Sequence, residues 1–118
     1  MTPLNLHQRV FVPVRNSEDG TVTSDTIFVF RQDGNDIIAN YSGGTVKSGH
    51  LMGVFETDST ARIVYHCLTL TETLKTGQAI ARFSDDNDGK LAIDMDWQWL
   101  SGDHGKGQSH YKELRGDA

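Results

Sequence analysis

Apolar residues alternate with small or polar residues, without a break, from Leu91 to Trp99. The odd positions of this segment are apolar: Leu91, Ile93, Met95, Trp97 and Trp99. The even positions are small or polar: Ala92, Asp94, Asp96 and Gln98. A β-strand with one buried face and one face in water produces this period of two. The segment therefore predicts a strand that carries both tryptophans of the chain on its buried side.

Clusters of Gly, Asn, Asp and Ser separate short runs that are rich in β-branched and aromatic residues. These runs predict strands at 9–14, 23–31, 36–41, 45–56, 61–71, 78–84, 90–100 and 107–113. No window of twelve or more residues has apolar positions at helical spacing. A meander of about eight strands would leave two edge strands with unpaired backbone N–H and C=O groups, unless the sheet closed into a barrel. We therefore predict an all-β fold, a single antiparallel up-and-down barrel spanning residues 1–118, with a β-sandwich as the alternative.

The amino-acid composition indicates which classes of binding partner are unfavourable for this chain. The chain has 118 residues, a net charge of −5 and one cysteine, Cys67, and its mean hydropathy is −0.45. An acidic chain without a Lys/Arg cluster does not favour nucleic acid or an anionic membrane as a partner. Residues 1–8 lack the pattern of a secretory signal, and no intramolecular disulfide is possible. We expect a cytoplasmic protein.

Several aromatic and polar residues are candidates for a ligand site inside the barrel. Trp97 and Trp99 either fill the core or form a stacking wall for a ring-shaped ligand, with Phe28 or Phe30 nearby. Tyr41 closes the third predicted strand, and His50 lies in the middle of the fourth. Tyr65 and His66 are adjacent, so that only one of them faces the lumen. The predicted ligand-binding residues are Trp97, Trp99, Tyr41, His50, Tyr65, His66 and Phe28.

Two glycines, Gly49 and Gly53, share a face of the fourth strand and flank Leu51. One interpretation is that they relieve crowding where the strand bends around the barrel. The other is that their missing side chains make room for a ligand or for the tryptophans. The sequence leaves both open.

No motif identifies a metal, a cofactor or a catalytic group. The five histidines and Cys67 lack zinc-type spacing, so no metal site is predicted. The glycine-rich stretch from Gly102 to Gly107 is not followed by a helix that could bind phosphate, and it is typical of a hairpin turn. No catalytic residue and no cofactor can be assigned.

Several motifs, taken together, resemble a family of small bacterial proteins that are commonly labelled N-acetylglutamate synthase. The motifs are Asn5-Leu6, Arg9-Val10-Phe11-Val12-Pro13-Val14, Tyr41-Ser42-Gly43-Gly44, Gly49-His50-Leu51, and Trp97-Gln98-Trp99 with Gly102-Asp103. The resemblance implies no activity and no catalytic residues. An acetyl-CoA loop would need Arg or Gln where Gly102 stands, with a helix after it, so the residues argue against acetyl transfer. The predicted fold is similar to calycin-type barrels such as lipocalins and avidins, by analogy of fold alone.

Three functions follow as hypotheses. The favoured one is a barrel that binds a small apolar or aromatic ligand in its lumen. The second is a small-molecule enzyme in the same cavity, with His50 or His66 as acid or base and Tyr41 or Tyr65 as donor. The third is a protein-interaction module, with a homodimer as one form. The sequence leaves open whether the chain is an enzyme, and the absence of a catalytic motif argues against catalysis.

Overall fold

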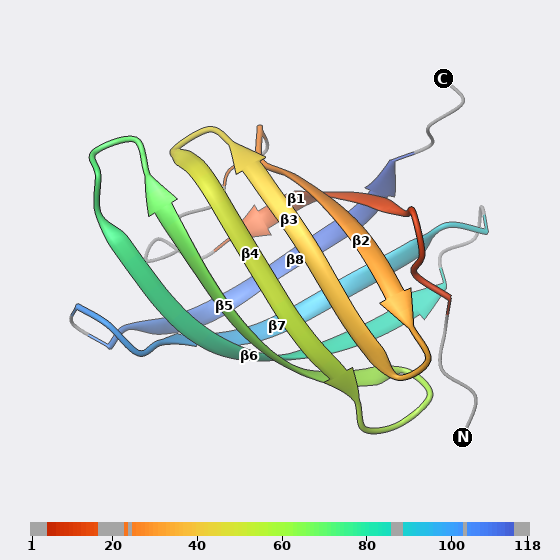
Figure 1. Cartoon of the computed structure of the whole chain (residues 1–118). Helices are drawn as coiled ribbons and strands as arrows, with labels where there is room; N and C mark the ends of the chain where they lie inside the picture. The colour runs from red at the N-terminus through yellow and green to blue at the C-terminus, as the bar shows by residue number, and fades with distance from the viewer. Residues whose placement is uncertain (1–4, 17–22, 24, 86–88, 103, 115–118) are drawn as a thin grey trace.

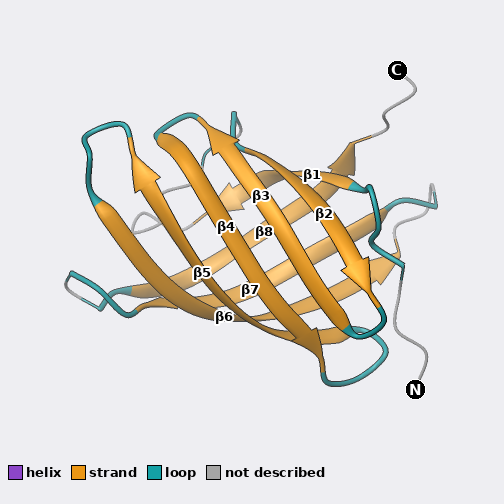
Figure 2. Ribbon diagram, viewed as in Figure 1, coloured by secondary structure: helices purple, strands orange, loops and turns teal. Residues whose placement is uncertain are grey.

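Eight antiparallel strands form a closed barrel in the computed structural model, which describes residues 5–16, 23, 25–85, 89–102 and 104–114 (Figure 1). The strands are β1 (Val10–Asn16), β2 (Ile27–Asp33), β3 (Asp36–Gly43), β4 (Val46–Phe55), β5 (Thr60–Thr69), β6 (Leu74–Asp85), β7 (Leu91–Trp99) and β8 (Lys106–Leu114). Strands and loops make up the whole of the described chain (Figure 2), which thus contains no helix able to cross a membrane. The predicted all-β barrel is confirmed, and the alternative of a sandwich is excluded by the closed strand order.

Along β7, the apolar side chains that alternate in the sequence point into the lumen, and the polar side chains between them point to the outer surface. Every odd position of β7 is buried, whereas Asp94, Asp96 and Gln98 are partly exposed. In β5, whose two faces look equally apolar in the sequence, the residues that point inward are Ala61, Ile63, Tyr65, Cys67 and Thr69. The hairpin between β7 and β8 is closed by a bond from Trp99 N–H to Gly105 O at 2.8 Å. Asp103, within that connection, lies outside the described residues.

The barrel closes where β1 meets β8. Six residue pairs join these two strands, from Val10 with Leu114 to Asn16 with Ser109, and their register shifts between Pro13 and Arg15. On its other side β1 pairs with β2 at only two positions. The segment before β1 continues this second pairing, because Gln8 N–H donates to Phe30 O at 2.8 Å and Phe30 N–H donates to Arg9 O at 2.9 Å.

One end of the barrel, here called the packed end, is filled with apolar side chains. It carries the β2–β3, β4–β5 and β6–β7 connections, and the residues buried there are Leu6, Phe11, Phe30, Ile37, Phe55, Ile63, Phe83, Leu91 and Ile93. Leu6 is fully buried although it precedes the first strand, and its N–H donates to Gln32 Oε1 at 2.7 Å. Glu113 ties the same end together, because its Oε1 accepts from Arg9 Nη1 at 2.7 Å and from Leu91 N–H at 2.9 Å. Any ligand in the lumen must therefore lie toward the opposite end.

Candidate functional site

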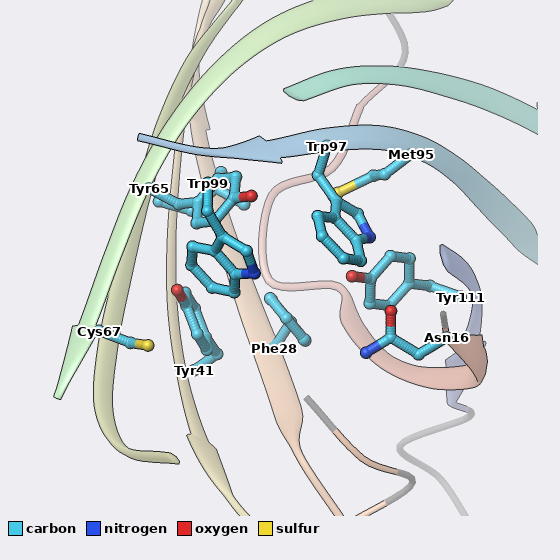
Figure 3. Close-up of a pocket in the computed structure, with 10 residues that line it drawn as sticks. Asn16, Phe28, Tyr41, Tyr65, Cys67, Met95, Trp97, Trp99 and Tyr111 are labelled. Atoms are coloured by element: carbon cyan, nitrogen blue, oxygen red, sulfur yellow. The ribbon is translucent and has the colours of Figure 1, made fainter. Parts of the chain in front are cut away.

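The half of the barrel opposite the packed end contains a small, only partly enclosed cavity of about 40 Å³ (Figure 3). Both tryptophans and all three tyrosines of the chain line it. The lining residues are Asn16, Phe28, Tyr41, Leu51, Tyr65, Cys67, Met95, Trp97, Trp99 and Tyr111. Every tryptophan and tyrosine of the chain therefore borders one space.

Two groups of aromatic rings face each other across this cavity (Figure 3). In the first group Trp99 lies between Trp97, at 5.9 Å between ring centroids, and Tyr65, at 5.4 Å in a T-shaped arrangement. In the second group Phe28 stacks on Tyr41 at 4.5 Å and meets the edge of Tyr111 at 5.2 Å. Offset and edge-to-face geometries of this kind stabilise aromatic pairs beyond their buried area. The rings therefore hold one another against the barrel wall.

Two glycines let two of these tyrosines lie flat against neighbouring strands. Tyr41 on β3 pairs with Gly49 on β4, and Tyr65 on β5 pairs with Gly77 on β6. A Cβ atom on either glycine would overlap the ring of its partner tyrosine. Glycine within a strand commonly marks such a close approach, with an aromatic ring covering it. Gly49 therefore makes room for Tyr41 rather than for the tryptophans.

We expect the substitution Gly49→Ala to destabilise the protein by about 1–3 kcal/mol, because the added methyl group overpacks against the Tyr41 ring. In a Tyr41→Leu background the same substitution should cost far less, since the ring is gone and alanine loses less backbone entropy than glycine in a strand. The measurement is a double-mutant cycle of free energies of unfolding in urea. Ser48→Ala, on the adjacent exposed position, is the control and should change stability by less than about 0.5 kcal/mol. Additive effects of the two substitutions would contradict the contact.

The cavity is electrostatically neutral, and its polar groups are hydroxyls, an amide and a thiol. None of the described lining residues is an acid or a base at neutral pH. Burial raises the pKa of Tyr41 and of Tyr65 well above the usual value and that of Tyr111 to about 12. Burial also raises the pKa of Cys67, a shift that the Lys75 charge and a hydrogen bond between Cys67 and Tyr41 partly oppose. Cys67 is therefore a thiol at neutral pH, without the lowered pKa that a nucleophilic cysteine needs.

The hydroxyl groups differ in what they can offer a ligand. Tyr41 OH donates to His66 O at 3.2 Å, so that its hydrogen is used within the barrel wall. Ser109 Oγ donates to Tyr111 Oη at 2.8 Å, which leaves the Tyr111 hydrogen to point elsewhere. Figure 3 shows the Tyr111 hydroxyl directed toward the space beside Trp97 and Phe28. Tyr111 is thus placed to donate a hydrogen bond into the cavity.

A lysine lies over one of the tryptophans just outside the lining. Lys75 Nζ is 4.4 Å from the centroid of a Trp99 ring, within the range of a cation–π contact. Lys75 pairs with Cys67 across β5 and β6, so its position belongs to the inward-facing row of β6. The contact places a positive charge over the face of the Trp99 ring.

The structure brings five of the seven predicted site residues together: Phe28, Tyr41, Tyr65, Trp97 and Trp99. Phe30, the alternative to Phe28, lies at the packed end. The expectation that His50 faces the lumen was wrong, because its side chain is exposed on the outer surface. Alternation requires this once Leu51 is buried. His66 is also exposed outside, since its neighbour Tyr65 takes the inward position. The enzyme hypothesis that placed either histidine in the cavity as a base is therefore contradicted.

Sequence reasoning missed five lining residues: Asn16, Leu51, Cys67, Met95 and Tyr111. Three of these carried a usable signal, because Leu51 lies between two inward-facing glycines, Cys67 shares a face with Tyr65, and Met95 shares one with the tryptophans. Tyr111 could also have been predicted from the sequence, since Ser109 and Tyr111 alternate with polar residues in β8. Asn16 carried no such signal, because the register shift in β1 changes which residues face inward.

A second set of polar groups lies on the outer face of β7 and β8. His110 Nδ1 is 2.6 Å from Asp94 Oδ1, and Asp96 accepts from Arg82 at 2.6 Å and from Gln108 at 2.8 Å. The bonds from Arg82 and Gln108 hold the pKa of Asp96 below its usual value. These carboxylates thus form a hydrogen-bonded outer surface, as the alternation in β7 predicts. In the described part of the chain, His, Cys, Asp and Glu side chains form no group of three or more suited to a metal.

Comparison with known proteins agrees with the barrel and its cavity. The family model described as avidin-like protein matches residues 4–114, which is nearly the whole chain. No curated protein and no solved structure matches significantly. Because a single family model covers all eight strands, the chain belongs to the avidin-like family.

Proposed function

We propose that the protein binds a small apolar or aromatic ligand in the cavity beside Trp97 and Trp99. The observation that carries the proposal is the convergence of both tryptophans, all three tyrosines and Phe28 on one partly enclosed space. Ligand sites are typically concave and apolar, with a few placed polar groups. Membership of the avidin-like family supports the same function. Streptavidin is also an eight-stranded barrel, and its lumen holds one small ligand, biotin.

The size of the cavity restricts how a ligand binds. A cavity of about 40 Å³ has room for little more than water, whereas an engineered cavity that admits benzene measures roughly 150 Å³. A ring can therefore enter only if a lining side chain moves. Tyr65 is the residue to move, because it is the most exposed of the aromatic side chains that line the cavity. The favoured ligand is planar and carries a hydrogen-bond acceptor for the Tyr111 hydroxyl.

The test is a screen of planar aromatic compounds against the full chain, with biotin as a separate, non-aromatic candidate. We expect a binding compound to raise the melting temperature, since a ligand at one hundred times its Kd stabilises the folded state by about 2.7 kcal/mol. Intrinsic fluorescence should change in parallel, because both tryptophans lie in the cavity.

Two variants make the screen specific to the cavity. Trp97→Ala should abolish the shift in melting temperature, whereas Trp97→Phe, which keeps an aromatic ring, should weaken it less. Val29→Thr, on the exposed outer face of β2, is the control and should leave it intact. Failure of every compound to shift the melting temperature, or a shift that survives Trp97→Ala, would overturn the proposal. A cytoplasmic location stays a prediction from the sequence.

A further inference from the structure

Two histidines stand side by side on the outer surface of the barrel. His50 on β4 and His66 on β5 are directly opposite each other in the register of these strands. Both side chains are exposed, and their ring centroids are 5.4 Å apart with the ring planes tilted by 48°. This pair is separate from the cavity, because adjacent residues of a strand point to opposite sides of the sheet.

The spacing of the two rings is that of two ligands on one metal ion. With metal–nitrogen bonds of about 2.1 Å, two imidazoles bound to a tetrahedral ion have ring centroids about 5.3 Å apart. The observed separation of 5.4 Å matches this value. The two strands hold the Cα atoms of His50 and His66 opposite each other, so that both rings can reach one ion.

The side chain of Asn40 orients the His50 ring for metal coordination. Asn40 on β3 lies opposite His50, and its Oδ1 is 2.8 Å from His50 Nδ1. Because a carbonyl oxygen can only accept, His50 donates through Nδ1–H and keeps the lone pair on Nε2. Histidines that ligate metals usually donate their second ring N–H to an oxygen in this way.

We propose that His50 and His66 form a two-histidine chelate for a divalent transition metal, with Asn40 as the residue that orients His50. Solvent would complete the coordination. Imidazole ligands favour Zn²⁺, Ni²⁺ and Cu²⁺, whereas Mg²⁺ and Ca²⁺ prefer oxygen ligands, and of the first three Zn²⁺ has the tetrahedral geometry that matches the ring spacing. The flanking outward-facing residues of β3 to β6 carry no charge: Asn40, Ser48, Met52, Val64, Leu68 and Thr76. Selectivity therefore comes from the nitrogen ligands.

The experiment is calorimetric titration of the full, untagged chain with Ni²⁺ and with Zn²⁺, and with Mg²⁺ as a negative control. We expect one ion of Ni²⁺ or Zn²⁺ to bind per chain. His50→Gln and His66→Gln should each weaken binding at least about ten-fold, since each removes one of two protein ligands. Asn40→Ala should weaken it about ten-fold, and Asn40→Asp should strengthen it by making the His50 ring a better donor to the metal. All four substitutions are at exposed positions, and thermal unfolding checks that the fold is kept.

Two further variants decide where the ion sits. His7→Gln, at an exposed histidine elsewhere, should leave the affinity within two-fold of the wild-type value. His110→Gln should do the same, because His110 is paired with Asp94 on β7. Loss of binding in either of these variants, unchanged binding when both His50 and His66 are replaced, or equal affinity for Mg²⁺ would overturn the proposal.

Discussion

No tyrosine of the folded protein is expected to ionise near pH 10, and the free energy of unfolding should fall steeply above that pH. All three tyrosines line the cavity, and burial raises the pKa of each above the ordinary value of 10.0. The folded chain therefore keeps phenol protons that the unfolded chain releases. The stabilisation is fully present below pH 10 and is lost as the pH rises through the folded-state pKa values.

The expected slope is large because the three groups act together. A buried tyrosine in this interval lowers the free energy of unfolding by about 1.4 kcal/mol per pH unit. Tyr41 and Tyr111 contribute this amount each, and Tyr65 contributes less because it is partly exposed to solvent. We expect the three tyrosines together to contribute a decrease of about 3–4 kcal/mol per pH unit above pH 10.

Two measurements check this expectation. Ultraviolet absorbance of tyrosinate should appear in one cooperative step that coincides with unfolding, and urea titrations at several pH values should give the slope. Tyr111→Phe removes a group with a folded-state pKa of about 12 and should reduce the slope by about 1.4 kcal/mol per pH unit. A tyrosine that titrates near pH 10 while the protein is still folded would contradict the burial of that ring.

The substitution Leu6→Ala is expected to cost about 2–5 kcal/mol, the usual range for a fully buried leucine. Leu6 lies outside every strand, yet its side chain is completely buried at the packed end. Its backbone is held by Gln32 and by a bond from Arg9 N–H to Leu6 O at 3.0 Å, so the segment cannot easily move in to fill the space. The measurement is urea unfolding at neutral pH.

An exposed leucine provides the matched control. Leu74 is 75% exposed, and Leu74→Ala should change stability by less than about 0.5 kcal/mol. Leu6→Ala should also leave the spectrum of the tryptophans unchanged, because the cavity lies in the other half of the barrel. A cost for Leu6→Ala no larger than that for Leu74→Ala would show that Leu6 does not close the packed end.

The strands of the barrel could be predicted from the sequence, but parts of its lumen could not. Strict alternation in β7 identified both the strand and its inward face, and the turn residues separated the other seven strands. Alternation fails as a guide where the outer surface is also apolar, as at Ile38, Met52 and Val64, which are 40%, 60% and 54% exposed and adjacent in register. For this reason the inward face of β5 stayed open until the pairing of Leu51 with Tyr65 was known.

The two least predictable features depend on contacts between distant segments. Leu6 belongs to no periodic pattern, so nothing local indicates that it closes the barrel. The contacts of Tyr41 with Gly49 and of Tyr65 with Gly77 depend on cross-strand register, which a one-residue slip would destroy. His50 is the opposite case, since its outward position followed from alternation alone once Leu51 was placed inside.

The strand order also constrains the path by which this chain folds. Seven of the eight strand pairings join consecutive strands, and six of these are hairpins with connections short enough to close rapidly and independently. The eighth joins Val10 to Leu114, so its formation encloses almost the whole polypeptide. Closing a loop of that length costs about 3 kcal/mol more than closing a short turn. A folding nucleus built from neighbouring hairpins therefore has the lower barrier, and the contact between the first and last strands is the step that converts a curved, open sheet into the native state.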